Sequence, residues 1–438
     1  MIITLITAFA LLILGLAFVR YKLAIVLYLA YMILVPHLNI NLPVWSVSYA
    51  TINAVLLLVL IYNIKLKNDL SFDFTATKPF IFLLSSLLFI TLFTKLVAPF
   101  FQVYRLGIDI MIVCVISFII WNVSINNAKF ITQAKWGLII SITIAGVYAI
   151  LIMPLGGENP YTSFLTNHFG LETDYAMSYV GIEMFRIRNQ GTTFHPMTWT
   201  FYLSIFSIFS LIFFLKERKL LYLGLLCFVI FNIIVADVRT GLAASILALA
   251  YIFVRYNKFS KTILWGTALV VILAFAVTAS EELLERFLSM IDTSGTKTNI
   301  EGSSITMRLE QFNGCLDIIS KSMLMGKGYF WTSYYITEYS MHPIALGFES
   351  LIFVVLCNHG IVGAALWAIF AIMLLRIPRK ILSVKENVYC VDGLVIFFFA
   401  YTVITGIFPD WLSIFAIYYS FILGYLYNEE KKEINCVS

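Results

Sequence analysis

The sequence is poor in charged residues. Of its 438 residues, 12% are charged, whereas 61% are hydrophobic. A soluble domain carries roughly a quarter charged residues, so a chain this apolar has too little polar surface to stay in water. This composition excludes a soluble fold and predicts membrane spans. The net charge of +5 is spread over many short connections, a pattern that indicates membrane orientation and not a nucleic-acid partner.

Metal and nucleotide motifs are also missing. The six cysteines show no CxxC or Cys/His spacing and most lie in apolar runs, so we expect neither a structural disulfide nor a metal site. Gly326-Lys327-Gly328 lacks the upstream glycine and the following Ser or Thr of a P-loop. We therefore expect no cofactor. The apolar stretch 1–19 has no basic n-region and no small-residue cleavage site, which predicts a first span instead of a cleaved signal peptide.

Apolar runs of about the length of a bilayer span recur along the whole chain. The expected fold class is therefore all-α, a polytopic transmembrane helical bundle of about 11 to 14 spans. The runs are 1–19, 24–41, 46–64, 79–95, 107–123, 137–155, 197–215, 220–236, 241–255, 262–280, 361–376, 390–408 and 411–427.

The basic residues orient these spans. If the connection 20–22 is cytoplasmic and the others alternate, 19 of the 29 Lys and Arg residues fall on the cytoplasmic side, as the positive-inside rule requires. The predicted parts are N-terminal helices 1–155, a large outer loop 156–196, central helices 197–280, a second large outer loop 281–360, and C-terminal helices with a cytoplasmic tail 361–438.

The second outer loop contains an amphipathic helix. Apolar residues at steps of three and four mark one helical face, which we expect to lie on the bundle with Arg308 and Lys321 off the apolar stripe. The stripe consists of Leu309, Phe312, Leu316, Ile319 and Met323.

Arginines lie at the outer ends of predicted spans. Arg186 and Arg188 occupy alternate positions just before a span, so in an extended segment they point the same way and suit bidentate contact with phosphate. Their alternative role is contact with lipid headgroups. Arg239 either pairs locally with Asp237 or shares the role of the loop arginines.

Other candidates follow in the second loop. Glu349 opens an apolar helix, where an acid also stabilises the positive end of the helix dipole. His342 and His359 are single histidines, and such residues are more often structural than catalytic. The turn around Lys327 contacts phosphate in one interpretation and simply terminates a helix in the other.

In their order and context, these segments resemble the O-antigen polymerase and ligase superfamily of bacterial envelope glycan enzymes. The resemblance covers about residues 180 to 376. It rests on Arg188 to Pro196 before a span, Arg239-Thr240-Gly241 opening another, Arg308 at the head of a loop helix, the turn at Lys327, and Gly360 and Gly363 starting the next span.

One position separates the branches of this superfamily. Ligases have a histidine ten to eleven residues before the final glycine pair, whereas this chain has Glu349-Ser350 there, as is common among polymerases. We therefore favour a Wzy-type O-antigen polymerase. The resemblance implies a bacterial inner-membrane glycosyltransferase whose active site faces the periplasm. It would join undecaprenyl-pyrophosphate-linked repeat units, donor and acceptor, among membrane lipids, and a chain-length-regulating membrane protein is a further candidate partner.

The implied reaction assigns roles to the candidates. A pyrophosphate leaving group needs fixed cations, supplied without a metal by Arg186, Arg188, Arg239 and Arg308, with Lys327 as a weaker candidate. The acceptor hydroxyl needs a general base. Glu349 is the first candidate for this base, and His342 or His195 is the second.

Three other functions remain open. A ligase would hand the finished glycan to a lipid A core or to a protein. A lipid-linked oligosaccharide flippase or transporter is disfavoured because the middles of the predicted spans are almost free of charge. A structural scaffold would leave the two long outer loops unexplained.

Overall fold

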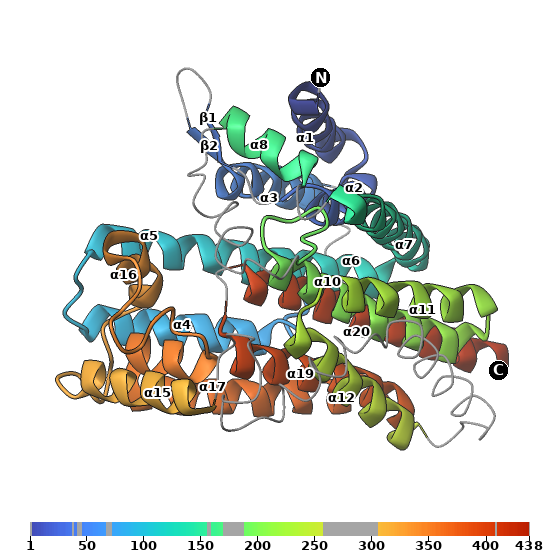
Figure 1. The fold of residues 1–438 in the computed structure, drawn as a ribbon. Helices are drawn as coiled ribbons and strands as arrows, with labels where there is room; N and C mark the ends of the chain where they lie inside the picture. The colour runs from blue at the N-terminus through green and yellow to red at the C-terminus, as the bar shows by residue number, and fades with distance from the viewer. Residues whose placement is uncertain are drawn as a thin grey trace, which may run out of the picture.

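The computed structural model describes residues 2–36, 39–41, 46–66, 72–155, 159–169, 188–256, 305–407 and 410–437. This part of the chain is a bundle of α-helices with one small antiparallel hairpin, β1 (Asn39–Asn41) and β2 (Ser46–Ser48) (Figure 1). The predicted all-α class is confirmed. The helices of the first half are α1 (Ile2–Val19), α2 (Tyr21–Leu34), α3 (Tyr49–Leu66), α4 (Lys78–Phe93), α5 (Pro99–Asp109), α6 (Ile116–Asn126), α7 (Ala128–Leu151) and α8 (Pro160–Phe169). Those of the second half are α10 (Pro196–Glu217), α11 (Leu220–Val235), α12 (Arg239–Arg255), α15 (Ile305–Ile319), α16 (Trp331–Tyr339), α17 (Leu351–Arg376), α18 (Pro378–Ile381), α19 (Lys385–Thr405) and α20 (Trp411–Val437).

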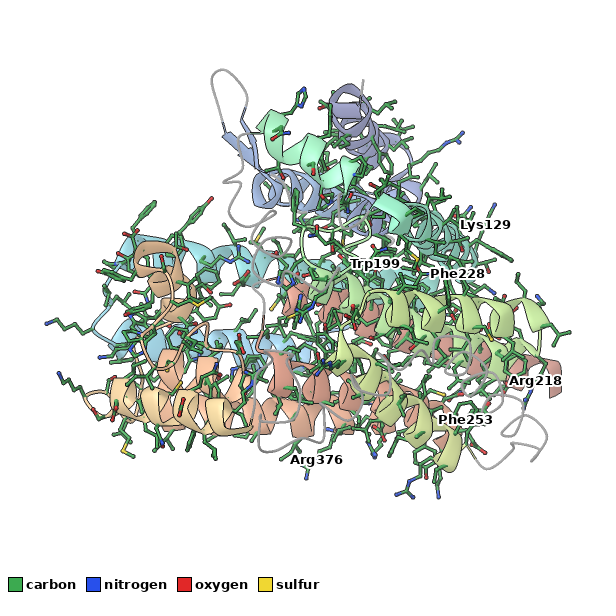
Figure 2. The ribbon with its side chains drawn as sticks, in the orientation of Figure 1. Lys129, Trp199, Arg218, Phe228, Phe253 and Arg376 are labelled. Atoms are coloured by element: carbon green, nitrogen blue, oxygen red, sulfur yellow. The ribbon has the colours of Figure 1, made fainter. Side chains whose placement is uncertain are left out.

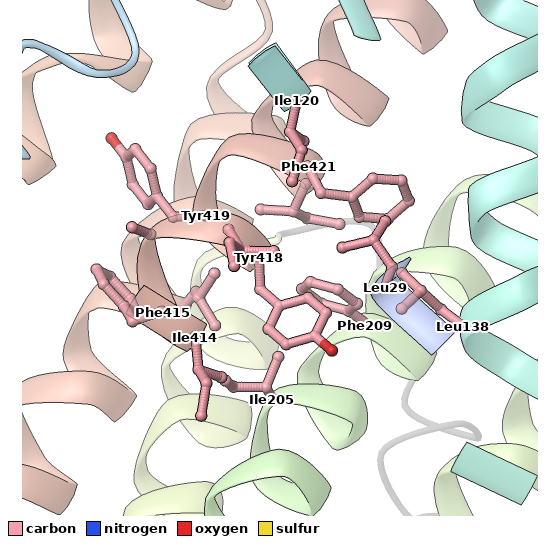
Figure 3. Packing of buried hydrophobic residues seen from close by; sticks show 14 of the residues in the cluster. Leu29, Ile120, Leu138, Ile205, Phe209, Ile414, Phe415, Tyr418, Tyr419 and Phe421 are labelled. Carbon is pink, nitrogen blue, oxygen red and sulfur yellow. The ribbon is translucent and has the colours of Figure 1, made fainter. Parts of the chain in front are cut away.

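Helix α20 forms the centre of the packed core. From Trp411 to Leu426 its side chains are mostly apolar and buried on every face, as expected for a helix segment that other helices surround. Figure 3 shows Tyr418 and Phe421 of α20 packed with Leu29 of α2, Leu138 of α7 and Phe209 of α10. Helix α10 is almost completely buried as well.

Several of the described helices could cross a membrane. Five are long and apolar enough: Pro99–Asn126, Ala128–Leu155, Pro196–Glu217, Leu351–Ile381 and Lys385–Thr405. Every predicted apolar run overlaps a described helix, except 262–280, which lies outside the described residues. The chain is therefore a multi-pass helical membrane protein, and the number of its spans remains a prediction.

Two span boundaries differ from the prediction. Helix α2 ends at Leu34 and not near residue 41, because Pro36 forces Val35 into extended backbone (φ −118°, ψ 121°). The helix predicted over 107–123 begins at Pro99 and runs through a π-helical segment, Ile110–Val115, to Asn126. The polar residues of α5 lower the hydropathy of its first turns, so hydropathy alone did not indicate that the helix begins there.

Helix α17 is interrupted at Gly360 (φ 62°, ψ −159°). The predicted span 361–376 forms the part after the break. Residues 351–359 are helical, although the sequence placed them in the outer loop. The predicted start of the span at 361 therefore corresponds to a break inside a longer helical run.

The amphipathic helix in the second loop exists as α15, but its buried face differs from the predicted one. Phe312 and Ile319 of the predicted stripe do pack in the core beside Cys315, whereas Leu309 is 60% exposed and Leu316 and Met323 are exposed too. The buried face packs on α17. Arg308 lies on the side of α15 that faces α17, where it pairs with Glu349. The expectation that it lies away from the packed face is wrong.

The basic ends of several helices lie together at one end of the bundle. Figure 2 shows Lys129 and Arg218 on the right-hand side, where α20 also ends. Lys135 pairs with Glu217, and Lys216 pairs with Glu433 at 3.4 Å. These residues belong to the predicted cytoplasmic set, whereas Arg376 of the same set lies away from this end in Figure 2, so the set and the side of the membrane that it faces remain predictions.

Candidate functional site

The segment from Arg188 to Pro196 is a buried turn held on three helices. The amide of Asn189 donates to the carbonyl of Ala149 at the end of α7, and the hydroxyl of Thr192 donates to the carbonyl of Ile33 in α2 (2.6 Å). Gly191 has φ +56°, and a Cβ there would lie 2.5 Å from the Trp199 ring. This glycine is therefore required by the backbone turn itself.

His195 caps helix α10. Its Nδ1 accepts a hydrogen bond from the backbone N–H of Met197 (3.1 Å), which satisfies one of the free donors of the first turn. Burial, together with the nearby charge of Arg188, lowers the pKa of His195 to about 3. A neutral imidazole in this position holds the helix start, and its role as a base stays a prediction.

This cap makes stability depend on pH. The pKa of His195 lies below that of an unfolded histidine, about 6.5, so the unfolded state takes up the proton first as the pH falls. The stability that the neutral His195 contributes is complete above pH 6.5 and is lost as the pH falls from there toward 3. At pH 5 the loss amounts to about 2 kcal/mol. We expect His195→Asn, which keeps an acceptor but does not titrate here, to lose less stability than the native chain between pH 7 and pH 5. Thermal unfolding in detergent at both values measures this, and equal losses would contradict it.

The structure places His195 and Arg239 at the starts of the neighbouring helices α10 and α12, and Arg188 in the turn that precedes α10. The charge of Arg188 acts on His195, and α12 begins at Arg239. Two residues later, Gly241 lies so close to Thr200 of α10 and Tyr401 of α19 that no side chain fits there. Helix α12 has no side-chain cap. Helix N-termini favour anions, and the binding of an anion by Arg188 and Arg239 stays a prediction. Arg186 lies outside the described residues.

Glu349 pairs with Arg308. Nη2 of Arg308 lies 3.1 Å from Oε2 of Glu349, while Nη1 donates to the backbone carbonyl of the same residue and to Gln311 (3.2 Å). Burial lowers the pKa of Arg308 and Glu349 partly offsets this, so the guanidinium keeps its charge. The pair is half-exposed, at 26% for Arg308 and 42% for Glu349.

The last turn of α19 connects the two groups. Ser350 follows Glu349, caps α17 and donates its hydroxyl to the carbonyl of Val403 (2.7 Å). Gly406 packs against the backbone from Phe348 to Ser350. Tyr401, one turn earlier, donates to the carbonyl of Met197 beside His195 (2.7 Å). The backbone beside Glu349 and the start of α10 beside His195 therefore both contact the last turns of α19.

His342 organises a turn of its own. Its Nδ1 accepts from the backbone N–H groups of Ile344 (3.1 Å) and Ala345 (2.9 Å), and burial lowers its pKa. Within the described part of the chain it makes no direct hydrogen bond or ion pair with Glu349. These hydrogen bonds show that His342 stabilises the conformation of the loop. Its catalytic role stays a prediction.

The Gly-Lys-Gly turn crosses α17 where that helix is broken. The N–H groups of Lys327 and Gly328 donate to the carbonyls of Cys357 (2.9 Å) and Asn358 (2.8 Å). The N–H groups of Ile361 and Val362 donate in return to Met323 and Leu324. The two glycine motifs of the sequence are therefore partners in one backbone crossing, a stronger role than a simple helix-terminating turn.

A buried charged group at this end of the bundle was missed from the sequence. Arg105 of α5 lies 3.2 Å from Asp109 and 3.3 Å from Asp410 at the start of α20. The hydroxyl of Tyr329 donates to Asp109 (2.7 Å). The signal was an acid four residues after an arginine within an apolar helix, since ionisable residues in such segments are usually functional.

Comparison with known proteins bears on the second half of the chain. No curated protein matches this sequence. A family model described as O-antigen ligase matches residues 223–368, which include Arg239, Arg308 and Glu349 but not Arg188. The chain is thus similar, over about a third of its length, to the superfamily of O-antigen ligases and polymerases, membrane enzymes that transfer glycans in surface polysaccharide assembly.

Proposed function

We propose that this protein is a membrane glycosyltransferase of the O-antigen polymerase type, which joins undecaprenyl-pyrophosphate-linked repeat units on the periplasmic face of the bacterial inner membrane. One observation carries the proposal. Glu349, a half-exposed glutamate, is held by Arg308, and its neighbour Ser350 contacts the last turn of α19, which through Tyr401 also contacts the start of α10 beside His195. Acid and cations are the two requirements of this transfer.

The reaction breaks the bond between the anomeric carbon of the donor glycan and its pyrophosphate oxygen. The bonding electrons leave with the pyrophosphate, so negative charge grows on that oxygen, and Arg188 and Arg239 stabilise it. The acceptor hydroxyl forms the new bond to the anomeric carbon. Its proton passes to the carboxylate of Glu349, which acts as general base. Arg186 and Lys327 are additional candidate contacts for the carrier phosphates.

Arg308 connects donor binding to the base. Its guanidinium lies 3.1 Å from the carboxylate of Glu349. A pyrophosphate carries more charge than a carboxylate and accepts bidentate hydrogen bonds from arginine. Donor binding therefore draws Arg308 away and leaves the Glu349 carboxylate to meet the acceptor hydroxyl.

The ligase is the second candidate, favoured by the description of the matching family. The presence of Glu349-Ser350, where the resemblance leads us to expect a histidine in ligases, supports the polymerase instead. A flippase fits less well, because the arginines gather at helix ends and not along the middle of a span.

The test is deletion of the gene, followed by electrophoresis of lipid-linked glycan and surface polysaccharide. A polymerase predicts single repeat units on the surface acceptor, because ligation continues without polymerisation. Long chains that stay on the carrier would identify a ligase. Repeat units trapped on the cytoplasmic side would identify a flippase.

A further inference from the structure

The group around Arg105 ties three segments of the chain together. The guanidinium of Arg105 contacts Asp109 in its own helix and Asp410 at the start of α20. It also lies 5.0 Å from the centre of the Phe330 ring, a cation–π distance. Asp109 is only 6% exposed, and it accepts from the hydroxyl of Tyr329. A buried carboxylate is stable only when it is paired and hydrogen-bonded in this way.

Gln102 strengthens the same attachment one turn earlier in α5. Its amide donates to the carbonyls of Lys327 (3.3 Å) and Tyr329 (3.0 Å). Gly328 lies so close to this amide that a Cβ there would be 2.9 Å from its nitrogen. Helix α5 therefore holds the segment that crosses the break in α17.

Each of the two segments held by Arg105 and Asp109 is close in the chain to a residue that contacts the backbone or side chains beside Glu349. After Phe330, the ring of Trp331 packs edge-on against Phe348, the residue before Glu349, with 6.0 Å between ring centres. On the other side, Asp410 follows the connection from Gly406, which packs against the backbone of 348–350. Among the described residues, Arg105 and Asp109 form their ion pairs and hydrogen bonds with each other, Asp410 and Tyr329, and not with Glu349 itself.

We propose that Arg105 and Asp109 are positioning residues for the transfer site, because they fix two elements to a single helix: the segment Lys327–Trp331, which packs on Phe348 next to Glu349, and Asp410 at the start of α20. The inference rests on the proposed function, because Glu349 needs a fixed position only if it is the general base of the transfer. A misplacement of about 1 Å at a reacting group can cost about 100-fold in rate, so loosening this group lowers turnover without touching substrate.

The experiment has one readout that needs no activity. In a chain whose native cysteines are all replaced, Glu349→Cys is labelled with a charged maleimide, alone and with Asp109→Asn. We expect the labelling rate to change several-fold when Asp109 is neutralised. Asp317→Asn is the matched control, because Asp317 is an exposed acid on α15, and it leaves the rate unchanged. Tyr329→Phe removes only one hydroxyl and serves if Asp109→Asn does not fold.

The second readout is polymerisation kinetics in the otherwise native chain. We expect Asp109→Asn to lower kcat by about 100-fold with little change in KM for the carrier-linked donor, and Arg105→Lys to retain more activity than Arg105→Met. Unchanged labelling and unchanged kcat in both Asp109→Asn and Tyr329→Phe would overturn the proposal. A labelling rate that responds to Asp109→Asn, together with no polymerisation by the native chain, would support the positioning role and refute the polymerase.

Discussion

Replacing Glu349 by glutamine is expected to lower kcat for glycan polymerisation by about 100- to 10,000-fold, the usual contribution of a general base. The carboxamide keeps the size of the side chain and its oxygen can still accept from Arg308, so the local structure stays intact. It cannot take the proton from the acceptor hydroxyl. KM for the donor is expected to change little, because the arginines that hold the pyrophosphate remain.

The measurement is extension of a lipid-linked repeat unit by the purified protein in vesicles, followed as a ladder on a gel. Glu310→Gln is the matched control, since Glu310 lies on the exposed side of α15 and is expected to leave the rate unchanged. A Glu349→Gln variant that polymerises within threefold of the native rate would remove Glu349 as the base. His342 and His195 would then be the next residues to substitute.

Replacing Gly360 by alanine is expected to destabilise the protein by about 4 kcal/mol. The backbone at this position (φ 62°, ψ −159°) lies in a region that essentially only glycine adopts. A Cβ would also lie 2.5 Å from the carbonyl oxygens of Met323 and Leu324, and relieving such a clash adds a cost of about 1–3 kcal/mol. The crossing of the two segments would have to open.

Gly224→Ala is the control for this substitution. Gly224 lies in α11, and nothing approaches within 4 Å of the place a Cβ would take. Alanine there is expected to stabilise the helix by about 0.5–1 kcal/mol. Thermal unfolding in detergent compares the two variants, and an unfolding midpoint for Gly360→Ala at or above the native value would show that the break in α17 is not required.

Hydropathy was sufficient to predict the fold class and most helix positions, because bilayer spans need long apolar runs whatever their neighbours are. It failed where local chemistry dominates. Pro36 shortened α2, and the polar residues of α5 hid its start. The buried face of α15 could not be chosen from periodicity, since Leu309 and Cys315 are both apolar and only contact with α17 decides between them.

Part of the geometry around the candidate residues agrees with the sequence analysis, while the roles of these residues stay predictions. Arg308 and Glu349, which are 41 residues apart, form the ion pair, and Arg188 and His195 lie together. The sequence could not show that α19 connects these groups, because Val403 and Gly406 act through their backbone and have no chemical signature. Arg105 and Asp109 were overlooked for a different reason. Their partners Tyr329 and Asp410 are far away in the sequence, so only the four-residue spacing of the pair itself could have indicated them.

The broken helix α17 has a consequence for biosynthesis. Its break frees carbonyl and N–H groups that hydrocarbon cannot satisfy, and the partners of these groups lie in residues 323–328. That segment precedes the break in the chain, so the ribosome has already released it when residues 357–362 emerge. The lateral transfer of α17 from the translocon into lipid can therefore be coupled to the docking of a loop made a few seconds earlier, and no later part of the chain is needed to complete that crossing.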